Sequence, residues 1–169
     1  MIVLEGPDGA GKSTLGSMLL RDRVITSLQE SPGRTRKQVP LMDQTLRYLR
    51  IYGSEPRVAV DRFLFSEMVY GPILREKSQF SQFNYMGILS ELVHRHAIII
   101  FCLPPVDDLK FKEDESPLVI QKIHMIHGAY EHYLQQISRM YDKIYRYNWK
   151  TLNAYDDLLR VLPKPEVKA

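Results

Sequence analysis

Short apolar runs alternate along the chain with longer stretches in which apolar residues recur at helical spacing. The clearest run, residues 96–103, is continuously apolar after its first residue, which is typical of a strand buried on both faces of a parallel sheet. The pattern predicts further strands over residues 1–5, 24–28, 57–61 and 147–152. It predicts helices over residues 15–21, 40–51, 64–77, 84–95, 118–145 and 155–162.

This order of elements predicts an α/β fold, a doubly wound sheet of about five parallel strands with helices on both faces. The chain has 169 residues, the length of one domain, and we expect that domain to span residues 1–162. Residues 163–169 form a polar tail. Because such sheets bind ligands beyond the carboxyl ends of their strands, we expect the functional residues there.

The first predicted strand leads into a glycine-rich loop, residues 6–14, with the phosphate-binding pattern G-x-x-x-x-G-K-[ST]. Its glycines let backbone N–H groups converge on a triphosphate, and the following helix adds positive partial charge. Lys12 would reach the β- and γ-phosphates, and the Ser13 hydroxyl would bind Mg²⁺. The loop therefore predicts a three-layer fold of the P-loop NTPase type. The residues expected to bind ATP are Gly6, Asp8, Gly9, Ala10, Gly11, Lys12, Ser13 and Thr14.

A carboxylate and an arginine, Asp61 and Arg62, follow the third predicted strand directly. Alone, they are also compatible with a helix cap and a surface arginine. With a phosphate loop upstream, Asp61 is expected to share Mg²⁺ with Ser13, and Arg62 to clamp phosphoryl oxygens. The loop at residues 32–35 also follows a strand, so all three segments should gather at one edge of the sheet.

The composition is that of an ordinary globular protein, 44% hydrophobic and 25% charged. A net charge of +3 fits a protein that handles anionic ligands but is too small to indicate nucleic-acid binding. The single cysteine, Cys102, excludes an intramolecular disulfide. The sequence contains no signal peptide and no apolar stretch of transmembrane length, so we expect a cytoplasmic protein that does not bind membranes.

Three segments together resemble the thymidylate kinase family and its deoxynucleoside monophosphate (dNMP) kinase relatives. They are residues 2–14 with an acidic residue inside the phosphate loop, residues 58–66 with Asp-Arg-aromatic and a downstream serine, and Pro-Gly-Arg-Thr at residues 32–35. The resemblance implies transfer of the γ-phosphoryl group of ATP to a dNMP, with Mg²⁺ as cofactor. It also implies a homodimer, as is common in this family.

The same resemblance implies roles for individual residues. Asp8 would accept a hydrogen bond from the 3′-hydroxyl of the acceptor, and Arg34 and Arg62 would hold its phosphate. Ser66 and Tyr70 would line the sugar and base pocket, with Tyr70 where a ribose 2′-hydroxyl would project. The catalytic residues implied are Lys12, Arg62, Asp8 and Asp61.

The chain departs from the family in the segment that reads the acceptor base, because residues 32–61 are fewer than is usual there. Only Arg47, Tyr48 and Arg50 on the predicted helix at residues 40–51 are available, and a solvated basic face explains them equally well. The acceptor base therefore stays open between dTMP, another pyrimidine dNMP and a 5-modified one.

The lid segment, expected over residues 106–117, also departs from the family pattern. It contains Lys110 and Lys112 but no arginine, so it would neutralise charge without a bidentate fork. A surface loop is the alternative. Residues 153–155 follow the last predicted strand, where related kinases contact adenine mostly through the backbone.

Two other functions are compatible with the sequence. A deoxynucleoside kinase would need a base that deprotonates the 5′-hydroxyl, and Glu30 lies near the required place. A nucleotide-binding regulator without acceptor activity would explain the short acceptor segment and the lid that has only lysines.

Overall fold

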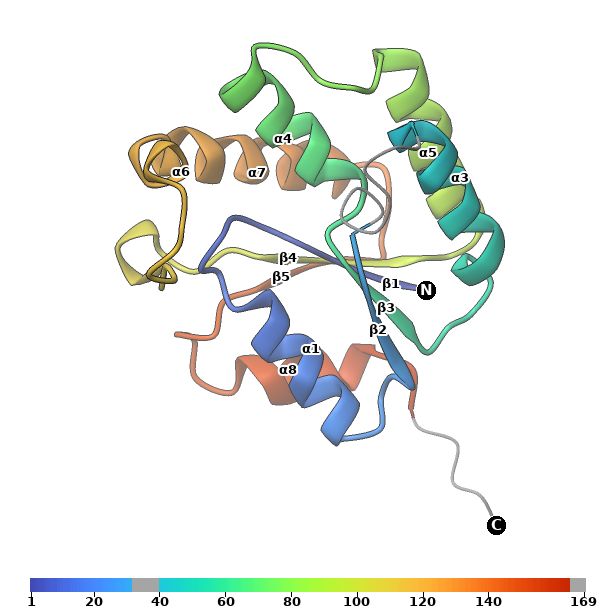
Figure 1. Ribbon diagram of the computed structural model, residues 1–169. Helices are drawn as coiled ribbons and strands as arrows, with labels where there is room; N and C mark the ends of the chain where they lie inside the picture. The colour runs from blue at the N-terminus through green and yellow to red at the C-terminus, as the bar shows by residue number, and fades with distance from the viewer. Residues whose placement is uncertain (32–39, 165–169) are drawn as a thin grey trace.

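Five parallel strands form the centre of the molecule in the computed structural model, which describes residues 1–31 and 40–164 (Figure 1). The strands are β1 (Ile2–Glu5), β2 (Ser27–Glu30), β3 (Val58–Asp61), β4 (Ile98–Cys102) and β5 (Ile144–Tyr147). Their order is β2-β3-β1-β4-β5, and every neighbouring pair is parallel. The predicted doubly wound parallel sheet is confirmed.

Helices cover both faces of this sheet (Figure 1). On one face lie α1 (Lys12–Arg21) and α8 (Ala154–Val161). On the other lie α3 (Leu41–Tyr52), α4 (Leu64–Arg75), α5 (Gln82–His94) and α7 (Ile123–Ile137). The short helix α6 (Pro117–Gln121) and the 3-10 turn η1 (Val106–Asp108) connect β4 to α7. No helix within the two described ranges is both long and apolar enough to span a membrane.

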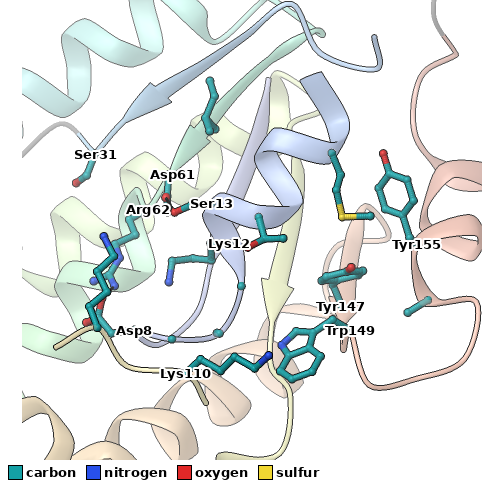
Figure 2. Close-up of a pocket in the computed structure, with 18 of the residues that line it drawn as sticks. Asp8, Lys12, Ser13, Ser31, Asp61, Arg62, Lys110, Tyr147, Trp149 and Tyr155 are labelled. Carbon is teal, nitrogen blue, oxygen red and sulfur yellow. Dashed lines mark hydrogen bonds and ion pairs between the residues drawn. The ribbon is translucent and has the colours of Figure 1, made fainter. Parts of the chain in front are cut away.

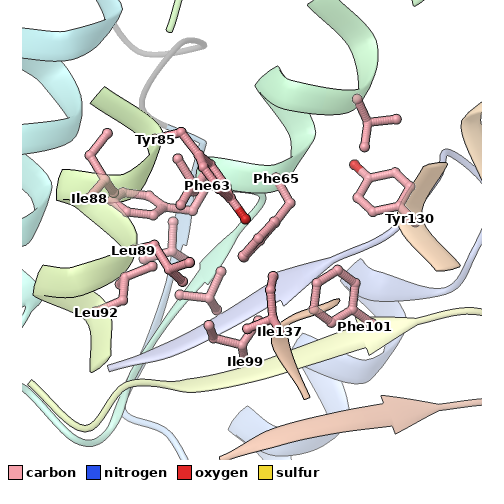
Figure 3. Close-up of a cluster of buried hydrophobic side chains, with 14 of the residues drawn as sticks. Phe63, Phe65, Tyr85, Ile88, Leu89, Leu92, Ile99, Phe101, Tyr130 and Ile137 are labelled. Carbon is pink, nitrogen blue, oxygen red and sulfur yellow. The ribbon is translucent and has the colours of Figure 1, made fainter. Parts of the chain in front are cut away.

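Each face of the sheet has its own apolar core. The larger core lies under α4, α5 and α7 and contains the aromatic rings of Phe65, Phe101 and Tyr130 (Figure 3). The ring centroids of Phe65 and Phe101 are 5.2 Å apart, a distance at which aromatic pairs attract each other. Because β1 and β4 are buried on both faces, β4 and the first three residues of β1 are continuously apolar instead of alternating.

The second strand lies later than the pattern predicts, at Ser27–Glu30 instead of residues 24–28. Val24 and Ile25 are buried, but they belong to the turn after α1. Their N–H groups donate to the carbonyl oxygen of Leu19 at 2.9 and 3.3 Å. They are apolar because they pack against the core, which the local pattern cannot distinguish from burial in a strand.

The helix predicted over residues 118–145 is also wrong in extent, since α6 and α7 replace it and α7 ends at Ile137. The N–H groups of Met140 and Tyr141 both donate to the carbonyl oxygen of Ile137, closing the turn. The Tyr141 hydroxyl donates to the carbonyl oxygen of Ala97 at 2.7 Å. This contact ties the turn to the start of β4, so β5 begins at Ile144 instead of residue 147.

Candidate active site

The glycine-rich loop joins β1 to α1 at the carboxyl edge of the sheet and wraps around the side chain of Lys12. The Lys12 ammonium is buried and donates to the carbonyl oxygens of Gly6 and Pro7 at 2.9 and 2.6 Å. Gly6 has a φ of 139°, and a Cβ atom there would overlap the carbonyl oxygen of Cys102 in β4. Only glycine therefore lets the loop leave β1 so close to β4.

The environment of Lys12 lowers the pKa of its ammonium to about 8, chiefly through burial and secondly through the positive charge of Arg62. Asp61 and Asp8 oppose this shift without cancelling it. The nearby carboxylates therefore do not fully compensate the positive charge of the buried Lys12 ammonium. A phosphate group bound in the loop would supply that charge.

Ser13 and Asp61 provide hard oxygen ligands next to Lys12. The Ser13 hydroxyl donates to Oδ2 of Asp61 at 3.1 Å. The other carboxylate oxygen, Oδ1, is buried and accepts no hydrogen bond from the described residues. A buried acceptor without a donor is a position that a cation satisfies, so this pair fits Mg²⁺.

No cluster of three or more histidine, cysteine or carboxylate side chains suited to a metal occurs within residues 1–31 and 40–164. Mg²⁺ keeps several waters and takes further oxygens from substrate phosphates, so it does not require such a cluster. Two protein ligands are therefore compatible with the expected magnesium site.

Asp8, Arg62 and Tyr70 form an interlocked group beside the phosphate loop. Figure 2 shows Asp8 and Arg62 next to each other at this end of the cavity. Arg62 forms an ion pair with Oδ1 of Asp8. The Tyr70 hydroxyl donates to Oδ2 of Asp8 at 2.8 Å and accepts the Asp8 backbone N–H at 3.0 Å. The Arg62 guanidinium lies 5.0 Å from the centre of the Tyr70 ring. Three different elements thus meet here: the loop through Asp8, the end of β3 through Arg62, and α4 through Tyr70.

The electrostatics of this group favour the ionised carboxylate. Burial alone would raise the pKa of Asp8, but Arg62, the Tyr70 hydroxyl and Lys12 together lower it. Arg62 has a φ of 69°, an uncommon conformation for a residue other than glycine. Its backbone N–H donates to the carbonyl oxygen of Leu4 at 2.8 Å, which holds the guanidinium near the loop.

Glu5, which the sequence analysis did not single out, anchors the segment after β3. Its fully buried carboxylate accepts the N–H groups of Phe63 and Phe65 at 2.8 and 3.0 Å and the Ser66 hydroxyl at 2.6 Å. The Ser66 hydroxyl also lies 2.8 Å from that of Tyr130. The Ser66 hydroxyl is thus already hydrogen-bonded within the protein, to Glu5 and Tyr130. Burial raises the pKa of Glu5, against the opposing hydrogen bonds.

A cavity of about 1060 Å³ extends along the phosphate loop toward α8 (Figure 2). Asp8, Asp61 and Arg62 line it, together with residues 9–14. Lys110 and Lys112 of the expected lid line it as well. The Lys110 N–H donates to the carbonyl oxygen of Gly9 at 3.1 Å, so the lid segment lies directly against the loop.

The structure unites most of the predicted residues, but not all of them. Ser66 and Tyr70 are not among the residues that line the cavity, although Tyr70 reaches it through Asp8. Arg34 lies outside the described residues. On α3, Tyr48 packs edge-on against Tyr52, with ring centroids 5.4 Å apart.

Other cavity residues come from the end of β5 and the start of α8. Residues 153–155, expected near adenine, line the cavity, and so does Trp149, which the sequence analysis did not select. The shifted start of β5 explains the omission, because the predicted strand placed Trp149 inside the sheet. A correct strand boundary would have put this aromatic residue just beyond a strand end.

No protein-family model matches the sequence, and no curated protein matches it either. Solved structures do match. The chain is 17% identical to the YorR protein of Bacillus subtilis in complex with phosphorylated GDP, with a TM-score of 0.69 over 95% of this chain and 94% of that one. It is 12% identical to deoxyadenosine kinase from M. mycoides with bound dATP, with a TM-score of 0.59 over 94% and 97% of the two chains. The chain therefore shares the fold of these two proteins, a five-stranded parallel sheet with helices on both faces.

Proposed function

We propose that the protein is a kinase that transfers the γ-phosphoryl group of ATP to a deoxynucleoside monophosphate. The observation that carries this proposal is the interlocked group of Asp8, Arg62 and Tyr70 next to the phosphate loop. A loop that only binds nucleotide needs no second basic group facing its phosphates. Arg62 lines the cavity, and a guanidinium has enough donors to bind a second anion while it stays paired with Asp8.

The chain's residues would act by placing two anions and neutralising the charge between them. Lys12 and the loop N–H groups bind the donor phosphates, while Arg62 and Arg34 bind the acceptor phosphate. Mg²⁺, held by Ser13 and Asp61, supplies further neutralisation of the phosphate oxygens when bound. Lys110 and Lys112 approach from the lid. Phosphoryl transfer needs little covalent chemistry from the protein, so this set of charges is sufficient.

Asp8 would orient the sugar of the acceptor. Its carboxylate is ionised and can accept a hydrogen bond from a 3′-hydroxyl without releasing Tyr70. The resemblance to thymidylate kinases favours dTMP or a related, including 5-modified, pyrimidine nucleotide. It also supports a homodimer, for which light scattering should give twice the 19.7 kDa mass of one chain.

A deoxynucleoside kinase is the second candidate, and Glu30 is the observation that favours it. Glu30 ends β2, is paired in register with Asp61 and lines the cavity. Its carboxylate could therefore take a proton from a 5′-hydroxyl group. The likeness to deoxyadenosine kinase supports the shared fold and does not choose between the two acceptors.

Coupled detection of ADP release over a panel of deoxynucleosides, dNMPs, NMPs and 5-substituted pyrimidine dNMPs tests the proposal. We expect dNMPs to be converted to diphosphates, with dTMP or a 5-modified relative preferred. Phosphorylation of thymidine alone would overturn the proposal in favour of the second candidate. ATP binding without any acceptor turnover would indicate a nucleotide-binding regulator.

Matched variants separate the two kinases further. In a dNMP kinase, Arg62→Ala should raise the acceptor KM and lower kcat, while Glu30→Gln should change both little. In a deoxynucleoside kinase, Glu30→Gln should abolish turnover. Lys12→Ala should abolish transfer in either case, and thus serves as the inactive reference.

A further inference from the structure

We propose that Trp149 is the platform on which the base of the donor nucleotide stacks, and that the base takes the place of the Lys110 ammonium on the indole ring. The proposal rests on the proposed function only in assigning the phosphate loop to a nucleotide. It deepens that function by giving the donor base a specific partner.

Trp149 lies where a nucleotide bound in the phosphate loop would place its base. It lines the same cavity as the loop, on the side toward α8 (Figure 2). Its Cδ1 atom would be only 3.2 Å from a Cβ atom at Gly11, so the ring lies directly beside the loop backbone. Thr151 and Asn153 line the cavity nearby and offer polar groups to the edge of a base.

The backbone around Trp149 is already fixed by hydrogen bonds. The Asn148 side-chain oxygen accepts the Lys150 N–H at 3.0 Å, and the Asn148 carbonyl oxygen accepts the Thr151 N–H at 2.9 Å. The Lys150 ammonium forms an ion pair with Asp108 at 2.9 Å and lies 5.4 Å from the indole centre. These contacts position the ring before any nucleotide arrives, which lowers the cost of binding.

The Lys110 side chain comes from the lid segment and places its ammonium over the indole ring of Trp149. Its ammonium lies 5.1 Å from the indole centre, while its backbone N–H is bonded to Gly9 of the phosphate loop. Its side chain therefore runs from the loop to Trp149 (Figure 2). A stacked base outweighs a partly exposed cation–π contact. Once the ammonium is displaced, the Lys110 backbone stays bonded to Gly9, so donor phosphates in the loop would attract the freed charge.

Trp149 is the single tryptophan of the chain, so its fluorescence reports on this site directly. We would titrate the wild-type protein with ADP and with inorganic tripolyphosphate, and measure both affinities by calorimetry in Trp149→Ala and Trp149→Phe. We expect ADP, but not tripolyphosphate, to shift and quench the emission strongly. Trp149→Ala should lose about tenfold or more in ADP affinity, Trp149→Phe should keep most of it, and tripolyphosphate should bind all three proteins alike.

Equal losses for ADP and tripolyphosphate in Trp149→Ala would overturn the proposal, because Trp149 would then only support the loop. Unchanged ADP affinity, or no ADP binding to the wild type, would overturn it as well. If Trp149→Ala does not fold, the wild-type fluorescence and Trp149→Phe still decide. The titrations contain no acceptor nucleotide and measure binding alone, so a failed transfer reaction would refute the proposed function and leave this result standing.

Discussion

At the scale of single residues, we expect the charge state of Lys12 to control phosphate binding at the proposed site. Burial and Arg62 lower the pKa of Lys12 to about 8 in the free protein, whereas a bound phosphate favours the charged form. Below about pH 8 the ammonium is already charged. Above it, binding must take up a proton, so affinity falls by up to about tenfold per pH unit.

Calorimetric affinities for ATP from about pH 6.5 to about 9.5 check this prediction. The matched variant is Lys12→Ala, which should bind ATP weakly and show no fall in affinity above pH 8. A flat profile for the wild type would mean that Lys12 keeps its proton throughout this range, or that it does not contact the phosphates.

Tyr70 allows a test that separates the ring from the hydroxyl. Tyr70→Phe keeps the ring but leaves the partly buried Asp8 N–H without its acceptor, which should lower the free energy of unfolding by about 1 kcal/mol. If the ring excludes a ribose 2′-hydroxyl, Tyr70→Phe should keep the preference for dNMPs over NMPs and Tyr70→Ala should relax it. The ratio of kcat/KM values for the two substrate classes measures this, and an unchanged ratio in Tyr70→Ala would exclude the role.

At the scale of elements, Glu5 couples β1 to the first turn of α4. It accepts hydrogen bonds from Phe63, Phe65 and Ser66, and these contacts follow directly after Arg62. Glutamine at this position keeps one oxygen for the two N–H groups but places an NH2 group opposite the Ser66 hydroxyl, so Glu5→Gln removes the acceptor of that hydrogen bond and weakens the other two. We expect urea denaturation to show a loss of about 1.5–3 kcal/mol, with a lower kcat because the Arg62 backbone shifts.

Ser66→Ala is the control for this prediction, because it removes one donor and leaves the carboxylate in place. It should cost about 1 kcal/mol and change kcat little. A cost equal to that of Glu5→Gln would place the effect in the contact between Ser66 and Tyr130 instead of the anchor on β1.

Element boundaries were also where prediction from sequence failed. The second strand, the helix over residues 118–145 and the last strand were each misplaced, while the existence and order of the strands were correct. Val24, Ile25 and Tyr141 are buried by contacts with other elements. The spacing of apolar residues indicates which positions are buried but not which element buries them. An apolar residue in a turn can therefore extend or shift a predicted strand or helix.

At the scale of the whole molecule, both apolar cores pack against one sheet, so the domain should unfold in a single transition. MgATP at about 100 times its Kd should stabilise the fold by about 2.7 kcal/mol, raising Tm by about 5–10 °C in a chain of this size. Differential scanning calorimetry measures both. Lys12→Ala should show a much smaller shift, and two separate transitions in the wild type would contradict a shared core.

The sequence by itself determined the features that depend on local pattern. The phosphate loop is recognised by the spacing of its glycines and Lys12, and the parallel sheet by continuous apolar runs between helices. Asp61 and Arg62 were identified by their place after a strand. Each of these signals lies along the chain itself, so the order of the strands in space was not needed to detect it.

Only the tertiary structure decided which of these residues contact one another. Asp8 and Tyr70 are separated by 62 positions, and Glu5 and Ser66 by 61. They meet because β3 pairs with β1 in parallel, an arrangement that chain order does not state. The same folding brings Trp149, at the end of β5, beside Gly11. The physical reason is that contacts between the ends of different strands depend on how the whole sheet is assembled. The local pattern of apolar and polar residues does not specify that assembly.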